Sequence, residues 1–93
     1  MDREIYNGHV LGTYKFLESV SGAKLCFHDE LKSGGSLEVH EISPENVIVL
    51  YVNYFTGRDW RSRITLIGDE SKIGEVERRI LEAETDRHFL ENE

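Results

Sequence analysis

The sequence predicts a single α+β domain: a five-stranded antiparallel β-meander packed on one face by a long C-terminal amphipathic helix. Two patterns support this fold class. Clusters of glycine, serine, asparagine and proline recur about every ten residues through the first two thirds of the chain, as turns between short strands do. After Asp69 the apolar residues change to the spacing of a helix.

The length and composition fit one domain with one hydrophobic core. The chain has 93 residues, of which 39% are hydrophobic, and its single proline is not typical of a disordered segment. The longest apolar run, residues 47–52, is far shorter than the roughly 20 residues of a membrane span, and the first residues lack the apolar core of a signal peptide. A cytoplasmic location is therefore expected. The one cysteine excludes an intrachain disulfide.

The strands are expected near residues 8–19, 23–31, 36–42, 46–55 and 60–67. Ser21-Gly22 would form a two-residue turn that places Val20 opposite Ala23 on one face of a first hairpin. A helix over residues 10–20 is the alternative, because the apolar residues of this segment also fit a period of about 3.6. These residues are Val10, Leu11, Tyr14, Leu17 and Val20.

The last hairpin is expected to turn through residues 56–59. A four-residue loop pairs Phe55 with Trp60 and Tyr51 with Ile64, which gathers aromatic and aliphatic side chains on one face. A two-residue loop would instead set Trp60 against Asn53. The sequence therefore favours the longer loop.

The C-terminal helix is expected over residues 70–90, with Asp69 or Ser71 as its cap. Its apolar stripe consists of Ile73, Val76, Ile80, Ala83 and Leu90. Glu75 and Arg79, Arg78 and Glu82, and Arg87 and Glu91 are spaced for ion pairs between successive turns. The opposite surface of the helix is acidic.

One helix covers one face of a sheet, yet the strand near residues 46–55 is apolar on both sides, which predicts burial on both faces. Either the sheet curls over its second face or another subunit covers it. The sequence favours a homodimer, because dimers are the commonest closed oligomers. The predicted interface residues are Leu17, Cys26, Ile48, Leu50, Val52 and Tyr54.

Two histidines lie among acidic residues on neighbouring predicted strands. One register sets His28 opposite His40 and Glu30 opposite Glu38, and the register one step along sets His28 opposite Glu38. Two imidazoles with carboxylates are ligands for Zn²⁺ or another first-row metal. The predicted metal ligands are thus His28, Glu30, Glu38 and His40, and ordinary surface residues on a solvated strand pair are the alternative.

Positive charge and aromatic residues alternate only over residues 51–63. Such a pattern is typical of stacking surfaces for single-stranded nucleic acid or of anion sites, here with Arg58, Arg61 and Arg63. Against this, most of the aromatic residues are expected on the core face. The net charge of −7 also opposes binding to nucleic acid or anionic membranes. Ion pairs with the acidic helix are the favoured role of these arginines.

No serine lies in a nucleophile-elbow pattern, and Gly34-Gly35 lacks the lysine of a phosphate-binding loop. The favoured function is a non-enzymatic interaction or regulatory module that binds itself or another protein. A metal- or small-ligand-binding protein is the first alternative, and an enzyme of unknown reaction is the second. No cofactor is expected beyond a divalent metal.

Overall fold

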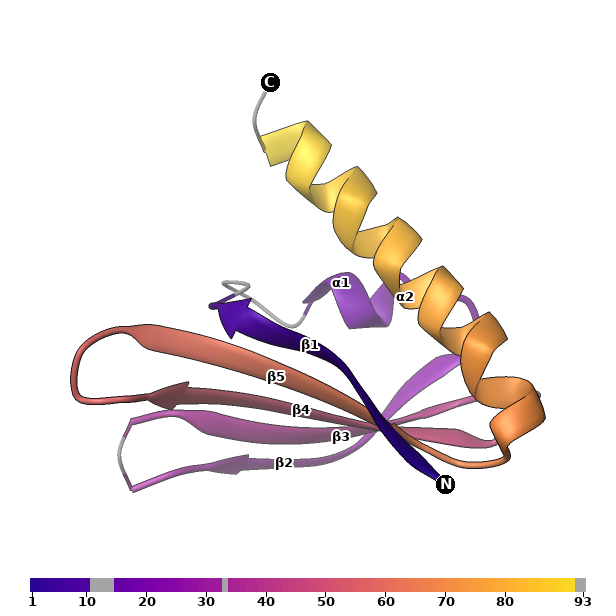
Figure 1. Ribbon diagram of the computed structural model, residues 1–93, viewed down its shortest axis with the longest axis horizontal. Helices are drawn as coiled ribbons and strands as arrows, with labels where there is room; N and C mark the ends of the chain where they lie inside the picture. The colour runs from indigo at the N-terminus through magenta and orange to yellow at the C-terminus, as the bar shows by residue number, and fades with distance from the viewer. Residues whose placement is uncertain (11–14, 33, 92–93) are drawn as a thin grey trace.

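The computed structural model describes residues 1–10, 15–32 and 34–91, and its side-chain description omits residues 15–16 and 84–91. A five-stranded antiparallel sheet forms one layer, and two helices lie on the same face of it (Figure 1). The elements are β1 (Asp2–His9), α1 (Lys15–Glu18), β2 (Ala23–Glu30), β3 (Ser36–Ile42), β4 (Val47–Phe55), β5 (Trp60–Ile67) and α2 (Glu70–Glu91). The predicted α+β class, with its antiparallel sheet and C-terminal helix, is confirmed.

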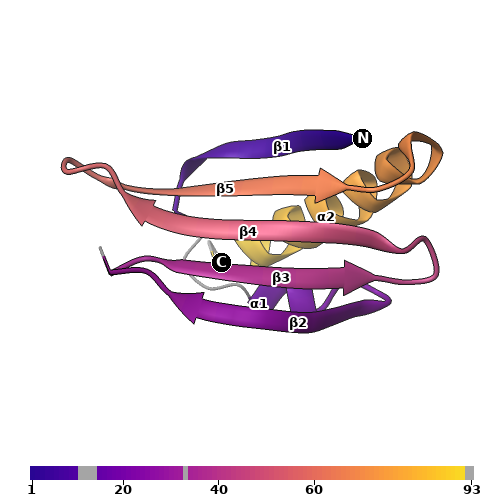
Figure 2. The same cartoon turned by 90° about the horizontal axis from the view of Figure 1, so that it is seen from below.

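The strand order is β1-β5-β4-β3-β2, so only β2 to β5 form a meander, and β1 joins the sheet beside β5 (Figure 2). Strands β2 to β5 lie within one residue of their predicted bounds. The prediction of a strand over residues 8–19 is wrong. The first strand ends at His9, residues 15–18 form α1, and the part of the prediction over residues 11–14 lies outside the described residues.

The predicted hairpin at Ser21-Gly22 is also wrong, because β2 pairs with β3 alone. The alternative of a helix over residues 10–20 is correct only for residues 15–18, which form α1. Leu17 and Val20 lie three residues apart on one side of this turn, and both are buried. Because both side chains are buried beneath α2, this segment follows the helical period and not the alternation of a strand.

The β4–β5 hairpin has the predicted register, with Phe55 opposite Trp60 and Tyr51 opposite Ile64. Its turn is held by the hydroxyl of Thr56, which accepts hydrogen bonds from the backbone N–H groups of Arg58 and Asp59 at 3.3 and 3.2 Å. The four-residue loop therefore sets which side chains of both strands face the helices.

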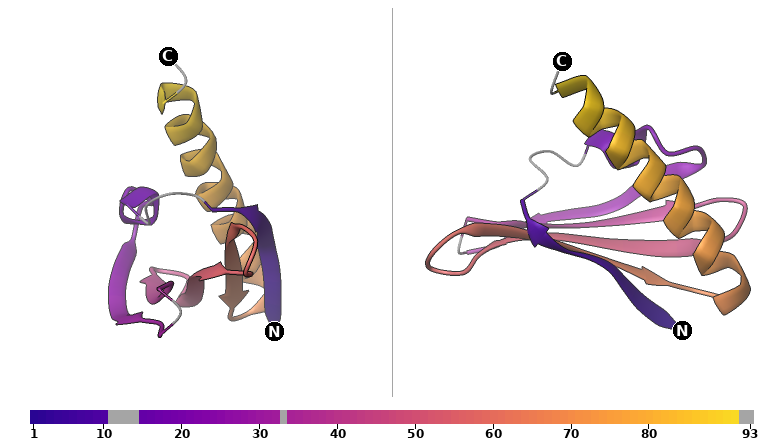
Figure 3. Two further views of the ribbon diagram at one scale, coloured as in Figure 1. Left: turned by 90° about the vertical axis from the view of Figure 1, so that its left-hand side faces the viewer. Right: turned by 45° about the horizontal axis from the view of Figure 1, so that its top comes forward.

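The core lies between the sheet and the helices, as the two further views show (Figure 3). Alternate residues of the central strands point into it, since successive side chains of a strand face opposite sides. The buried apolar residues are Leu17, Val20, Ile42, Val47, Val49, Tyr51, Ile64, Leu66, Ile73, Val76 and Ile80. At the start of α2, Asp69 Oδ1 accepts hydrogen bonds from the backbone N–H and the hydroxyl of Ser71 at 2.9 and 2.8 Å, which confirms the predicted Asp69 cap.

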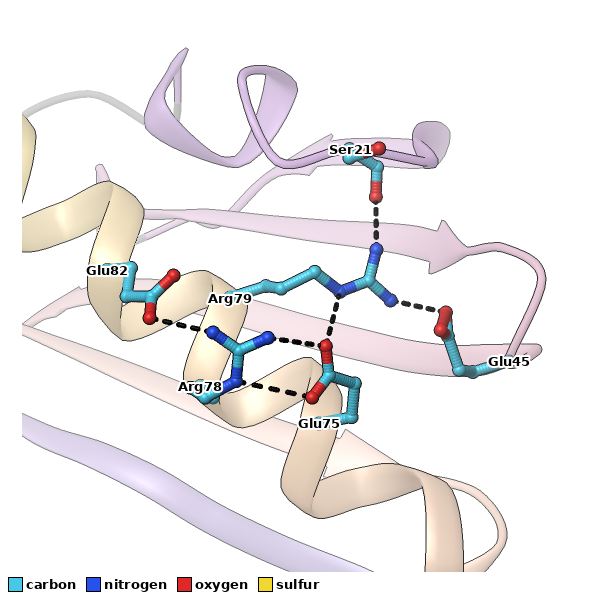
Figure 4. A network of polar contacts seen from close by, with 6 residues as sticks. All are labelled: Ser21, Glu45, Glu75, Arg78, Arg79 and Glu82. Atoms are coloured by element: carbon cyan, nitrogen blue, oxygen red, sulfur yellow. Dashed lines mark hydrogen bonds and ion pairs between the residues drawn. The ribbon is translucent and has the colours of Figure 1, made fainter.

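Arg79 connects α2 to two loops (Figure 4). Its guanidinium donates to the carbonyl of Ser21 at 2.7 Å and binds the carboxylate of Glu45, and it lies 4.0 Å from Glu75. Arg78 pairs with Glu75 and Glu82 at 2.6 and 2.7 Å on the outer side of the helix. The predicted pairs Glu75–Arg79 and Arg78–Glu82 are therefore present, while the Arg87–Glu91 pair lies among side chains outside the description.

Replacing Arg79 with methionine is expected to lower the free energy of unfolding by about 1–2 kcal/mol, because it leaves Glu45 and the Ser21 carbonyl without their donor. The side chains of Arg79 and Glu45 are only 18% and 15% exposed, so solvent replaces these contacts poorly. Arg78→Met is the matched control, since the ion pairs of Arg78 are exposed and contribute little. Urea denaturation of both variants measures the difference, and equal stabilities would contradict the role of Arg79.

Candidate functional site

The predicted metal ligands lie on β2 and β3, on the face that the helices cover. A β-bulge between Leu25 and Phe27 shifts the register of the two strands, and as a result His28 lies opposite Glu38. This is the second of the two registers that the sequence allows. The first, which sets His28 opposite His40, is wrong.

Glu38 lies between the two histidines. Its Oε1 is 3.3 Å from Nδ1 of His28, and its Oε2 is 3.4 Å from Nε2 of His40. The side chains of Glu38 and His40 are 0% and 1% exposed, whereas that of His28 is 36% exposed. Glu30 lies outside this buried contact, with its Oε1 3.4 Å from Nε2 of His28 and its side chain 77% exposed. We call Glu38 with His28 and His40 the buried cluster.

Burial controls the proton affinities in the buried cluster. Loss of hydration raises the pKa of Glu38 from 4.5 to about 7, against the opposing effect of His28, and the charge of Glu18 on α1 adds to the rise. Burial lowers the pKa of His40, and Glu18 acts in the opposite direction. The cluster therefore exchanges a proton near neutral pH, in surroundings that disfavour charge on either group.

Polar side chains continue from the buried cluster across the same face of the sheet. Tyr51 lies opposite Glu38 on β4 and is fully buried. Next to this pair, Asn53 donates from Nδ2 to the hydroxyl of Ser36 at 3.4 Å and accepts from the hydroxyl of Ser62 at 2.5 Å. The predicted register that pairs Phe55 with Trp60 also sets Asn53 opposite Ser62, but the sequence alone did not identify this polar row. Polar residues at inward-facing positions of β3, β4 and β5 were the feature of the sequence that could have revealed this row.

Among the described residues, no group of three or more histidine, cysteine, aspartate or glutamate side chains is placed to hold a metal ion. Nδ1 of His40 is buried without a hydrogen-bond partner within the same residues. Metal binding by His28, Glu30, Glu38 and His40 stays a prediction.

The predicted interface residues do not all share one face. Register places Ile48, Leu50, Val52 and Tyr54 on the side of β4 that faces away from both helices. Leu17 instead lies in the core, because it belongs to α1. Cys26 lies at the bulge of edge strand β2, where its thiol is exposed and lies 3.5 Å from the carbonyl of Lys24.

The side of the sheet opposite the helices is termed the open face. No helix or strand covers it within the described part of the chain, and Figure 2 shows it toward the viewer. Its central side chains are half-buried, and its edges carry charged groups. The apolar residues of the open face are Phe27, Leu37, Val39, Ile48, Leu50, Val52, Tyr54 and Ile67.

The three predicted anion-binding arginines are divided between the β4–β5 turn and the open face. Arg58 lies in the turn and is exposed, and Arg61 lies opposite Tyr54 on the open face. Arg63 binds Glu4 of β1 at 3.1 Å and lies 5.8 Å from the centre of the Tyr54 ring. Its described carboxylate partner therefore comes from β1.

The aromatic pair of the hairpin lies on the other side of the sheet from Arg61 and Arg63. The ring centres of Phe55 and Trp60 are 5.3 Å apart, and the two side chains are 45% and 40% exposed. Because residues 55 and 60 share the face of Tyr51, they do not form a joint stacking surface with these arginines. Nucleic-acid binding gains no support from this arrangement.

Comparison of the chain with protein-family models, with curated proteins and with solved structures finds no match. In the described residues, neither helix has the length and apolar character needed to cross a membrane.

Proposed function

We propose that this chain is a non-enzymatic protein-interaction module that acts as a homodimer through the open face. The observation that carries the proposal is the apolar centre of that face, where Leu50 and Val52 of β4 lie beside Val39 and Leu37 of β3. Contiguous apolar surface of this kind is typical of interaction sites. The cytoplasmic location expected from the sequence belongs to this proposal.

The charges around the apolar centre favour a second copy as the partner. Arg63 on β5 and Asp29 on β2 lie at the level of Val52, on opposite sides of the apolar centre, and Arg63 also pairs with Glu4 of β1. A two-fold axis parallel to the strands would place the β5 side of one copy over the β2–β3 side of the other. Arginines would then face acids twice in one interface, which favours this orientation over others.

We further propose that α2 is an amphipathic helix that keeps its acidic side free for a partner while the open face is occupied. Ile73, Val76 and Ile80 are buried against the sheet, whereas Glu75 and Glu82 are exposed. The two surfaces lie on opposite sides of the molecule, so self-association would leave the helix accessible.

Sedimentation analysis of the purified chain over a range of concentrations tests the homodimer. The expected result is a species of twice the chain mass of 10.8 kDa. Leu50→Asp should weaken association by about 100-fold or more, because a charge would be buried at the centre of the interface. Leu81→Asp is the matched control, since Leu81 is 42% exposed on α2. A wild-type chain that stays at the monomer mass at millimolar concentration would overturn the proposal.

A further inference from the structure

Arg63 and Asp29 lie on the open face at one level of the sheet. The strand register sets Arg63 of β5 beside Val52 of β4, and Leu37 of β3 beside both Val52 and Asp29 of β2. Neighbouring strands are about 4.8 Å apart, so three spacings separate the two charged residues by roughly 14 Å. Within one chain, two apolar side chains therefore keep these charges apart.

Both charged groups have the chemistry for a further contact. Arg63 binds Glu4 through Nε at 3.1 Å, and its guanidinium also carries four N–H groups on the two terminal nitrogens. Asp29 accepts the backbone N–H of Glu30 at 2.9 Å through Oδ1, and its carboxylate has a second oxygen. Both residues are exposed. The planar arginine fork fits a second carboxylate that approaches from above the open face.

The position of a two-fold axis along the open face decides which residue Arg63 meets in a second copy. An axis parallel to the strands keeps every residue at its own level. Placed over β4, or between β4 and β5, it sets Arg63 on Leu37 or Val52, which buries a charge against an apolar side chain. Placed between β3 and β4, it sets β4 on β3 and β5 on β2, so apolar residues meet at the centre and Arg63 meets Asp29.

An axis that runs across the strands gives the opposite result. It sets β5 on β5 and β2 on β2, so charges of one sign face each other on both sides of the apolar centre. Among these arrangements, the parallel axis between β3 and β4 is the one that joins the arginine to the acid.

We propose that Arg63 of each copy binds Asp29 of the other, and that these two ion pairs select the orientation and register of the homodimer. The inference rests on the homodimer proposed above and adds the residues that choose how the second copy docks. Strand β1 then lies outside the interface, because β5 of one copy reaches only as far as β2 of the other. Arg61 lies at a level that β2, which ends at Glu30, does not reach.

Sedimentation of charge-reversed variants of the full chain tests the ion pairs. Asp29→Lys and Arg63→Glu should each weaken dimerisation by about 30-fold, because each replaces two attractions with two repulsions. The double variant exchanges the charges and should return the dissociation constant to within about threefold of the wild-type value. A double variant that is as weak as the single variants would overturn the proposal.

Neutral variants keep the test decisive should Arg63→Glu, which places a second acid beside Glu4, fail to fold. Arg63→Gln and Asp29→Asn should each weaken the dimer by about three- to tenfold, because either change removes both ion pairs. Asparagine keeps the oxygen that accepts the N–H of Glu30. Because the two residues act as one pair, the combined variant should lose no more than either single variant, and additive losses would contradict the contact.

Arg61→Gln and Glu30→Gln are the matched controls for the two neutral variants. Arg61 lies on the same strand and face as Arg63 but beyond the end of β2, and Glu30 follows Asp29 but points to the other side of the sheet. Both changes should leave the dissociation constant within about twofold of wild type. Losses equal to those of Arg63→Gln and Asp29→Asn would show a general effect of net charge and contradict a specific pair.

The same measurements separate this inference from the proposed function. A wild-type chain that stays monomeric at millimolar concentration would overturn both. A dimer that Leu50→Asp disrupts, and that Arg63→Gln and Asp29→Asn leave unchanged, would support the homodimer through the open face and contradict this orientation.

Discussion

Glu38→Gln is expected to change how the stability of the whole fold depends on pH. The folded chain keeps a proton on Glu38 up to about pH 7, whereas the unfolded chain releases it near 4.5. The stabilisation from this group is therefore complete below pH 4.5 and is lost as the pH rises through 7. Glutamine resembles the protonated acid and has no such loss.

The difference in the free energy of unfolding between Glu38→Gln and wild type should grow in favour of the variant from pH 5 to pH 8. Each tenfold difference in proton affinity is worth about 1.4 kcal/mol, which gives about 3 kcal/mol for the full interval. Water that reaches Glu38 once it ionises would lower this penalty, so we expect about 2 kcal/mol.

His40 has the opposite dependence, because burial lowers its pKa below 6.5. Its stabilisation is complete above that pH and is lost as the pH falls, so it partly cancels the slope of Glu38 in the wild type. The comparison with Glu38→Gln isolates the carboxyl group. Urea denaturation at four pH values with Glu30→Gln as control measures it, and a difference that stays constant with pH would refute the expectation.

Gly22→Ala is expected to destabilise the chain by about 3 kcal/mol or more, through two separate effects. Gly22 has a φ of 83°, which a side chain disfavours. A Cβ at this position would also lie 2.0 Å from the carbonyl oxygen of Ser43. The backbone cannot withdraw easily, since the N–H of Ser43 donates to the carbonyl of Gly22 at 3.0 Å.

Gly57→Ala separates the two effects. Gly57 has a φ of 90°, but apart from its two chain neighbours no described residue has an atom within 4 Å of the position that a Cβ would take, so only the backbone preference is lost. We expect this variant to lose about 1 kcal/mol. Thermal and urea denaturation measure both variants, and an equal loss would show that contact with Ser43 contributes nothing.

The sequence could predict those parts of the fold that depend on neighbouring residues in the chain, such as a hairpin. The turn at residues 56–59 and the alternation of β4 gave the register of Phe55 with Trp60, because pairing within a hairpin depends on neighbouring residues alone. β1 could not be placed in the same way. Its first residues, Asp2-Arg3-Glu4, are exposed and carry no apolar alternation, and only contact with β5 defines the strand.

The sequence predicted which residues belong to the buried cluster, but it did not predict which of them lie opposite one another. The sequence brought His28, Glu38 and His40 onto one face, and the bulge at residues 25–27 then decided which of them met. Nothing local indicates that bulge. Glu18 acts on Glu38 from α1, whose period was ambiguous, so the raised pKa of the carboxyl group could not be foreseen.

The position of β1 at the far edge of the sheet determines the order in which the strands can assemble. Asp2 pairs with Ile67 and His9 with Arg61, so β1 must wait for the last strand of the sheet before it has a partner. On a ribosome, β1 emerges before the other four strands of the sheet and is then the last of the five to be incorporated. Hairpins from β2 to β5 can form early, whereas closure by β1 is a long-range step that we expect to limit the folding rate.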